Sequence, residues 1–284
     1  MNERSVLITG CSSGIGWATA VEMAARNWRI FATARKPEDM ERIEAEGWHA
    51  VALDVSSSDS IEQAVSTVLE ATDGALDGVV NNAGFGMPGA IEDLSREAMQ
   101  RQFEVNLFGA VELTNRLLPA LRKQPQGRVV CISSLVGRMS LPFMGIYSAS
   151  KFALEAVADA QRIELSMTPV RVVLIEPGPI GTRFSATCAM EGESRLKVNR
   201  SRFKGAYERY FKQRRSGGMS EDRFRLPPEA VAQKVAHALI SDRPKVRYLV
   251  TLPTYVADFL VRFVPVCWRD GVMQRQVKKR FGSV

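Results

Sequence analysis

The chain has few of the side chains on which hydrolytic and metal-dependent catalysis commonly rest. Among 284 residues it has only two histidines and four scattered cysteines: His49, His237, Cys11, Cys131, Cys188 and Cys267. A serine hydrolase needs a histidine base, but His49 enters a predicted strand and His237 falls on a late amphipathic helix. No cluster has the spacing of a zinc site or a redox pair. The sequence therefore predicts no hydrolase triad and no metal site.

Long apolar runs are also missing. No segment approaches the roughly 20 apolar residues that cross a bilayer, and no secretory leader is recognisable at the start. The cysteines do not form a disulfide framework, so we expect a reducing, cytoplasmic environment. Hydrophobic residues make up 45% and charged residues 24% of the chain, which is sufficient for a sizeable globular core.

Positive charge is concentrated late in the chain. The net charge is +7, and the segments 183–226 and 253–284 carry local excesses of seven and four positive charges. No nucleic-acid motif accompanies them, and we expect no nucleic-acid partner. Two interpretations stay open for these segments: solvated helix faces, or surfaces that meet an acidic partner or membrane.

Short apolar segments alternate with longer amphipathic ones over the first 180 residues. The apolar segments have hydrophobic residues at both odd and even positions, as in strands that are buried on both faces; they are 5–9, 29–34, 49–55, 77–83, 128–134 and 170–177. Helical patterns lie between them, at 15–27, 37–46, 58–72 and 95–123. This order predicts an α/β fold with one doubly wound parallel sheet and helices on both faces.

A glycine-rich turn, "TGCSSGIG" (9–16), follows the first predicted strand. Gly10 permits a tight turn, Gly14 permits close approach of a pyrophosphate, and Gly16 permits close packing of helix on sheet. The helix that follows presents free N–H groups to phosphate. A simple turn is the alternative, but the position after the first strand favours a dinucleotide.

The end of the second predicted strand indicates which dinucleotide. NAD sites commonly place an acidic side chain there, whereas this strand ends "ATARK", with Ala34 at that position and Arg35 next. A guanidinium can pair with a 2′-phosphate, and Ser12 can add a hydroxyl. The pattern favours NADP(H) over NAD(H), with an ordinary exposed arginine as the alternative.

Several polar residues are predicted to meet at the carboxyl edge of the sheet, where such folds bind ligands. Ser134 ends one predicted strand, "NNAG" (81–84) ends another, and Asn106 lies within a long helix. Tyr147 and Lys151 share one face of a helix because they are four residues apart. A cation about 4–5 Å from a phenol is worth roughly 3–4 kcal/mol at an effective dielectric near 20, so we expect Lys151 to lower the pKa of Tyr147.

Together these motifs, with "PGPIGT" (177–182), resemble the short-chain dehydrogenase/reductase family, nearest its hydroxysteroid and retinol dehydrogenase and aldehyde reductase branch. The resemblance covers roughly 4–182 and 227–251. It implies a Rossmann-like catalytic domain over 1–252, with a substrate lid at about 183–226, and leaves 253–284 as an amphipathic extension. It also implies a homo-oligomer.

The resemblance implies roles for individual residues. Tyr147 is the proton donor or acceptor, Ser134 binds the substrate oxygen, Lys151 holds the nicotinamide ribose, and Asn106 supports a water-linked proton path. The implied cofactor-binding residues are Gly10, Ser12, Ser13, Gly14, Ile15, Arg35, Asp54, Val55, Asn82, Ala83, Gly84, Tyr147, Lys151, Pro177, Gly178, Ile180 and Thr182. Substrate contacts are expected from Ser134, Leu141, Phe143 and Tyr147.

The predicted lid and its surroundings indicate the substrate class. The lid carries aromatic residues, and Phe143, Met144, Phe85 and Met87 are expected to form an apolar wall across the cleft, which favours a lipophilic aldehyde, ketone or alcohol. Simple packing under the lid is the alternative. The basic lid also suits an acyl-carrier ketoacyl reductase, and a non-catalytic NADP-binding sensor is a third hypothesis. The sensor is disfavoured because every catalytic residue is in place.

The tail contains "YVADFLVRFVPVCW" (255–268), in which Tyr255, Phe259 and Phe263 form an aromatic stripe at helical spacing. Pro265 is expected to interrupt the helix. The basic surroundings suit peripheral contact with a membrane. The alternative is a helix folded over the cleft or against a second subunit.

Overall fold

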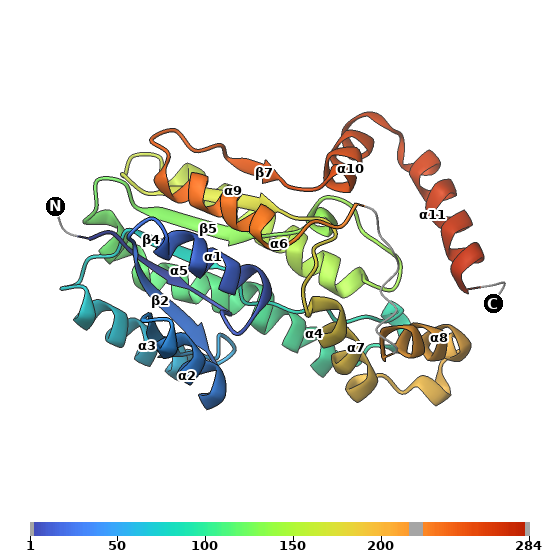
Figure 1. Ribbon diagram of the computed structural model, residues 1–284. Coiled ribbons are helices and arrows are strands. Elements are labelled where there is room, and N and C mark those ends of the chain that lie inside the picture. The colour runs from blue at the N-terminus through green and yellow to red at the C-terminus, as the bar shows by residue number, and fades with distance from the viewer. Residues whose placement is uncertain (1–2, 216–223, 282–284) are drawn as a thin grey trace.

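The computed structural model describes residues 3–215 and 224–281. A seven-stranded parallel sheet with the order β3-β2-β1-β4-β5-β6-β7 forms its centre (Figure 1). The strands are β1 (Ser5–Ile8), β2 (Arg29–Ala34), β3 (His49–Ala52), β4 (Gly78–Asn81), β5 (Arg128–Ile132), β6 (Arg171–Glu176) and β7 (Arg247–Leu249). The six strands predicted from apolar patterning all form, and β7 is an additional strand at one edge.

Helices cover both faces of the sheet, which is why the strands are apolar at both odd and even positions. Leu7 and Val79 belong to the core on the face covered by α3, α5 and α6, whereas Val6 and Val80 belong to the core on the face covered by α1, α2 and α9. The helices are α1 (Gly14–Ala24), α2 (Pro37–Ala45), α3 (Ser58–Ala71), α4 (Arg96–Phe103), α5 (Gly109–Arg122), α6 (Gly145–Glu164), α7 (Phe184–Arg195), α8 (Lys204–Arg215), α9 (Glu229–Ile240), α10 (Leu252–Phe263) and α11 (Val266–Phe281). The predicted doubly wound α/β fold is confirmed.

The long helix predicted over 95–123 is more complex than its sequence pattern suggests. A π-helical turn, η2 (Glu104–Phe108), joins α4 to α5 and contains Asn106. Such turns insert an extra residue into the helix and are often found at functional sites. Short 3-10 turns also occur at η1 (Ile91–Asp93), η3 (Leu135–Gly137) and η4 (Val198–Arg200).

The order of the strands fixes where a ligand can bind. The chain runs outward from β1 to β2 and β3 on one side and to β4 and its successors on the other, so the connections diverge beside β1. A crevice forms at such a point, outside the carboxyl ends of the strands. In Figure 1 these ends lie toward the same end of the molecule as α7, α8, α10 and α11.

Candidate functional site

The glycine-rich turn has the backbone geometry that its sequence predicts. Gly10 and Gly14 have φ angles of +74° and +62°, which favour glycine. A Cβ on Gly16 would lie 2.3 Å from the Gly10 carbonyl oxygen, and one on Gly14 would lie 3.0 Å from Thr182 Cγ2. The turn can therefore adopt this backbone and pack against its neighbours only because these side chains are absent.

The N-terminus of α1 suits a phosphate. Ser13 occupies the N-cap position with extended backbone but its side chain makes no capping hydrogen bond, and the first turn contains no acidic residue. The first N–H groups of the helix thus keep their capacity to donate, at the positive end of the helix dipole. Ser12, Ser13 and Ile15 flank this cradle and are only half-buried. The residues present fit a dinucleotide pyrophosphate.

The "NNAG" segment is held against this turn by a threonine that the sequence analysis did not single out. Thr9 Oγ1 accepts hydrogen bonds from the backbone N–H groups of Asn82 and Ala83, at 2.9 and 2.8 Å. Asn82 Nδ2 donates to the carbonyl oxygens of Thr9 and Gly10 at 2.7 and 3.2 Å. Thr9 lies more than 70 residues from its partners in the sequence, so no local pattern could identify its role.

Two arginines lie at the end of the turn where the adenosine would bind. Arg35 is exposed directly after β2. Desolvation raises the pKa of Asp54, but the hydrogen bonds from Ser56 and the charges of Arg35 and Arg101 together bring it below its ordinary value. Arg42, on α2, places its guanidinium over the ring of Trp17, 4.8 Å from its centroid, and donates to the Ser12 carbonyl at 3.4 Å. Sequence analysis found Arg35 but missed Arg42.

The remaining predicted cofactor residues border the same crevice. Val55 is buried beneath η2, where a Cβ on Gly109 would collide with its backbone, and Gly84 faces Asn106. Pro177 follows β6, Gly178 packs on the hydroxyls of Thr251 and Thr254, and Ile180 forms an isolated bridge with Leu226. These contacts fix the backbone of the "PGPIGT" segment beside Gly14.

Tyr147 and Ser134 meet at the carboxyl end of β5. Tyr147, on α6, is buried, and its phenol is hydrogen-bonded to the Ser134 side chain. Burial raises the pKa of Tyr147 well above its ordinary value, and the Ser134 hydrogen bond opposes the rise. The expected lowering by Lys151 is not found, because Lys151 is not among the groups that shift this pKa and desolvation of the phenol is the largest effect.

Lys151 lies one turn after Tyr147 and is also buried. Its Nζ donates to the Ile132 carbonyl at 2.7 Å. Burial lowers the pKa of Lys151 to about 8, while Cys131 and Glu155 act in the opposite direction. The ammonium is therefore close to titration at physiological pH.

Asn106 has the partners that a buried amide needs. Its Nδ2 donates to the Phe85 carbonyl at 2.9 Å and to Ser150 Oγ at 3.2 Å, and its Oδ1 accepts from the Phe85 N–H at 3.1 Å. Ser150 Oγ donates in turn to the Tyr147 carbonyl at 2.7 Å. Asn106 thus links the end of β4 to the helix that carries Tyr147 and Lys151.

A cluster of buried charges lies behind Lys151. Arg247, on β7, forms ion pairs with Glu155, Asp159 and Glu176 at 3.2, 2.6 and 3.1 Å. Burial raises the pKa of Glu155, and it raises that of Glu176, which is 0% exposed, to about 7. Sequence analysis did not identify this cluster because its members are brought together only by the sheet.

The first lid helix covers Tyr147 with apolar side chains. The Phe184 ring lies 5.4 Å from that of Tyr147. A Cβ on Gly86 would lie 3.0 Å from Met144 Cε, 3.1 Å from Cys188 Sγ and 3.2 Å from Phe184 Cζ. These three side chains therefore converge beside the phenol, and a substrate would meet an apolar surface there.

The other residues of the predicted apolar wall lie in two places, the loop that contains Phe143 and the core. Phe143 packs edge-on against Phe203 of the lid, with centroids 5.1 Å apart, and its φ of +61° is rare for a bulky residue. Leu141 is half-buried in the same loop. Phe85 and Met87 are buried among the apolar residues of the core, and their part in the wall stays a prediction.

Neither histidine lies near Ser134. His49 accepts from Arg29 Nε at 2.9 Å, and His237 Nδ1 lies 2.7 Å from Tyr248 Oη. All four cysteines are free. Within residues 3–215 and 224–281, no group of three or more His, Cys, Asp or Glu side chains is arranged to hold a metal ion.

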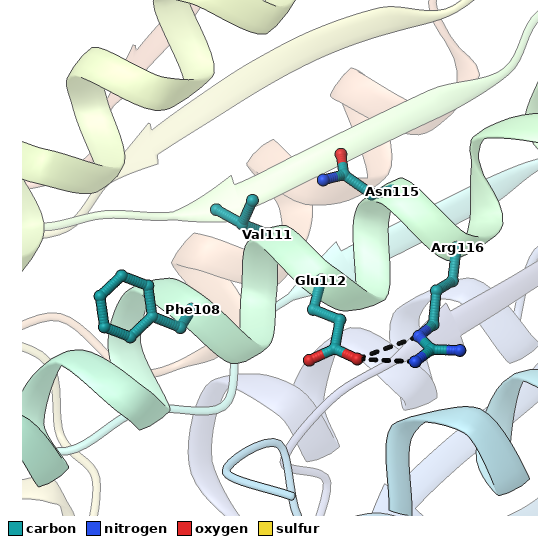
Figure 2. A pocket seen from close by; sticks show the side chains of 5 residues that line it. All are labelled: Phe108, Val111, Glu112, Asn115 and Arg116. Atoms are coloured by element: carbon teal, nitrogen blue, oxygen red, sulfur yellow. Dashed lines mark hydrogen bonds and ion pairs between the residues drawn. The ribbon is translucent and has the colours of Figure 1, made fainter. Parts of the chain in front are cut away.

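A shallow depression on the outer side of α5 contains none of these residues. Figure 2 shows its lining, in which Arg116 Nε donates to Glu112 Oε1 at 3.0 Å. The other lining side chains are Phe108, Val111 and Asn115. Because it lacks candidate catalytic groups, the candidate site is the group of polar side chains around Tyr147.

Comparison with known proteins shows to which family the chain belongs. The family model described as short chain dehydrogenase matches residues 4–191. The uncharacterized oxidoreductase YbbO of Escherichia coli is 44% identical over 96% of this chain and 94% of its own length. Human retinol dehydrogenase 8 is 35% identical, over 86% of this chain and 80% of its own.

A solved structure shows the same architecture. An alcohol dehydrogenase from Thermococcus sibiricus, complexed with 5-hydroxy-NADP, superposes with a TM-score of 0.70 at 26% identity, covering 88% of this chain and 97% of that one. The matching family model, the similar relatives and the parallel sheet agree on one conclusion: the chain belongs to the short-chain dehydrogenase/reductase family of oxidoreductases.

Proposed function

We propose that the protein is an NADP(H)-dependent oxidoreductase that reduces hydrophobic aldehydes or ketones, or oxidises the matching alcohols. The observation that carries this proposal is the buried phenol of Tyr147, which is hydrogen-bonded to the half-buried Ser134 and lies against the ring of Phe184 on α7. A carbonyl oxygen placed against two hydroxyls can be both oriented and protonated.

The bound nicotinamide cofactor supplies or accepts the hydride. Ser134 donates a hydrogen bond that orients the carbonyl oxygen, and Tyr147 gives that oxygen its proton. Because burial raises the pKa of Tyr147, the phenol is fully protonated at neutral pH, which suits the reductive direction. Lys151 places a positive charge near the site as the phenol loses its proton, and Asn106 holds α6 against the end of β4.

NADP(H) is the proposed cofactor. Two guanidinium groups support this choice: Arg35 is exposed directly after β2, and Arg42 donates to the Ser12 carbonyl oxygen and to Asp39, a pairing that a 2′-phosphate would have to share. Ala34 leaves no carboxylate at the end of β2 to repel the phosphate. The alcohol dehydrogenase from Thermococcus sibiricus, complexed with 5-hydroxy-NADP, gives related support.

An acyl-carrier ketoacyl reductase is the second candidate, because the lid is basic. Several lid cations are already paired, however: Arg195 with Glu191, Arg202 with Glu92 and Lys204 with Glu208. This pairing leaves less charge for an acidic carrier than the sequence suggests. A non-catalytic NADP sensor remains less favoured because Ser134, Tyr147 and Lys151 form a complete site.

We further propose a homo-oligomer that uses the outer surface of α5 and α6. Gln161 Nε2 donates to Asn115 Oδ1 at 3.3 Å, so the two helices lie side by side. Phe108, the last residue of η2 before α5, and Phe152 of α6 are exposed. Light scattering of the wild type and of a Phe108→Asp, Phe152→Asp variant tests this: a fall in mass supports the surface, and an unchanged mass contradicts it.

The central test is NADPH oxidation by the purified protein with a panel of medium-chain and aromatic aldehydes, ketones and a carrier-linked ketoacyl substrate. Tyr147→Phe should abolish turnover while NADPH affinity stays within about twofold, because it removes only the proton donor. Substantial turnover by Tyr147→Phe, or turnover confined to the carrier substrate, would overturn this assignment. NADPH binding with no turnover of any substrate favours the sensor.

A further inference from the structure

The helix α10 buries small side chains and exposes large apolar ones, which is the reverse of an ordinary surface helix. Its buried positions are the small residues Thr254 and Ala257. Its large apolar side chains point to solvent and share one face; they are Leu252, Tyr255, Val256, Phe259 and Phe263. A surface helix normally buries such a face, so this one is exposed for another reason.

The exposed apolar surface continues beyond the break at Pro265. Val266, Trp268 and Val272 of α11 are also exposed, and Trp268 has 71% of its surface accessible. Phe259 and Phe263 contact each other, with centroids 5.0 Å apart, while remaining 58% and 69% exposed. Contiguous apolar surface of this kind marks an interaction site in a monomeric protein. We call these eight residues the tail face.

Basic side chains accompany the tail face. Arg262, Arg275 and Lys278 are exposed on the two helices, and residues 253–284 carry six basic residues against two acidic ones. One of the two acids, Asp258, is neutralised by Arg138 and Arg262 at 2.7 and 2.9 Å. The described part of the tail is therefore apolar and positively charged.

Three kinds of surface could cover the tail face: the cleft of the same molecule, a second copy of the chain, or a lipid membrane. Exposure and charge distinguish among them. The cleft of the same molecule is excluded, because the tail-face side chains are open to solvent. A second copy in a two-fold contact would bring like charges together. An anionic lipid surface complements both features, since it accepts aromatic side chains at the headgroup level and attracts arginine and lysine. Among the described helices, none is long and apolar enough to cross a bilayer.

We propose that the tail face docks on an anionic lipid surface, with α10 and α11 lying in the interface and Phe259, Phe263 and Trp268 inserted among the headgroups. The docking does not depend on the proposed reaction. The position of the docked helices matters for that reaction, because α10 contacts the site at two places. Asp258 forms an ion pair with Arg138, four residues after Ser134, and Thr251 and Thr254 pack on Gly178. Docking would place the substrate crevice close to the lipid.

The test uses the full chain and sedimentation with sucrose-loaded vesicles of phosphatidylcholine, with or without 30% phosphatidylglycerol. Wild type should pellet with the anionic vesicles at low salt, and added salt should weaken but not abolish binding. Phe259→Ser, Phe263→Ser and Trp268→Ser together should reduce the partition coefficient by about tenfold or more. The matched control replaces apolar side chains that are exposed elsewhere: Val21→Ser, Ile163→Ser and Met167→Ser.

A second measurement places the contact within the chain. Brominated phosphatidylcholine in the anionic vesicles should quench tryptophan fluorescence in the wild type, and Trp268→Phe should lose most of that quenching while it still pellets. Wild type that stays in the supernatant, or a control variant as impaired as the tail-face variant, would overturn the proposal. A tail-face variant whose mass in solution falls while wild type ignores vesicles assigns the surface to a second copy instead. NADPH turnover, measured without lipid, should be alike in all variants.

Discussion

At the scale of single residues, Arg35 and Arg42 are the groups that we propose to bind the 2′-phosphate of NADP(H). We predict that Arg35→Ala and Arg42→Ala each weaken NADPH binding by roughly 10- to 100-fold, because a charge-assisted contact is worth about 1.5–3 kcal/mol. NADH affinity should change by less than about threefold, since NADH carries no 2′-phosphate. Fluorescence titration of both cofactors checks this for each variant and for the double variant.

Equal losses for NADPH and NADH would show that the arginines do not bind the 2′-phosphate. Arg26→Ala is the matched control, because Arg26 pairs with Glu22 on α1 and is exposed. It should leave both affinities unchanged.

Lys151 gives the reaction a predicted alkaline limit. The pKa of Lys151 is lowered to about 8 by burial, so the ammonium is present below this pH and is lost as the pH rises through it. Reduction should therefore slow above about pH 8, while Tyr147, with its raised pKa, stays protonated. The measurement is kcat/KM for carbonyl reduction from pH 6 to 10, with Lys151→Arg as the comparison.

The Lys151→Arg variant keeps its charge over this whole range. Whatever activity it retains should show no fall near pH 8. A fall at the same pH in both proteins would assign the limit to another group.

The sequence identified those residues whose chemistry is visible locally. Tyr147 and Lys151 share a helix face, and Gly10, Gly14 and Gly16 follow a strand, so their spacing is sufficient. Contacts made across the sheet have no such signal. Thr9, Arg42 and Glu155 were missed because their partners lie far away in the chain or because their burial could not be inferred. The predicted direction of the Tyr147 pKa shift was wrong because the burial of the phenol, which raises its pKa, could not be inferred from the spacing of Tyr147 and Lys151.

At the scale of elements, apolar patterning predicted six of the seven strands, because strands buried on both faces read as continuous apolar runs. β7 has only three residues and lies at an edge, which is too short for any pattern. The π turn in the predicted helix 95–123 was also invisible, because it depends on tertiary contacts of Asn106. The break at Pro265 is confirmed: α10 ends at Phe263 and α11 begins at Val266.

The contact between α10 and η3 leads to a prediction about stability and turnover. Asp258→Ala leaves Arg138 without its partner in a mostly buried setting and should destabilise the protein by about 1–3 kcal/mol. Because η3 directly follows Ser134, kcat should also fall. Chemical denaturation and steady-state kinetics measure the two effects.

Arg262→Ala serves as the control, since it removes the exposed partner of the same carboxylate. It should cost less than about 0.5 kcal/mol and leave kcat unchanged. If both variants lose the same stability, the effect belongs to α10 itself and not to its bond with η3.

At the scale of the whole molecule, the boundary between the domain of residues 1–252 and the tail of 253–284 stays a prediction. The two helices of the tail differ in how they pack on the rest of the molecule. α10 is anchored, because Thr251 and Thr254 pack on Gly178 and Asp258 holds Arg138. In α11, none of the side chains that the structure describes is buried. The point where the tail becomes dispensable for folding should therefore lie near Pro265 and not near residue 252.

Truncation distinguishes these boundaries. A chain that ends at Val264 should keep its melting temperature within about 2 °C of the full chain and bind NADPH equally well, because none of the side chains described in α11 is buried. A chain that ends at Val250 loses Thr251, Thr254 and Asp258, so it should melt at a markedly lower temperature and bind NADPH more weakly, since the Gly178 backbone loses its support. Calorimetry with and without NADPH measures both effects. If the shorter chain melts like the full one, residues 1–252 form the folding unit as the sequence suggests; if removing α11 alone is as damaging, that helix packs on the domain.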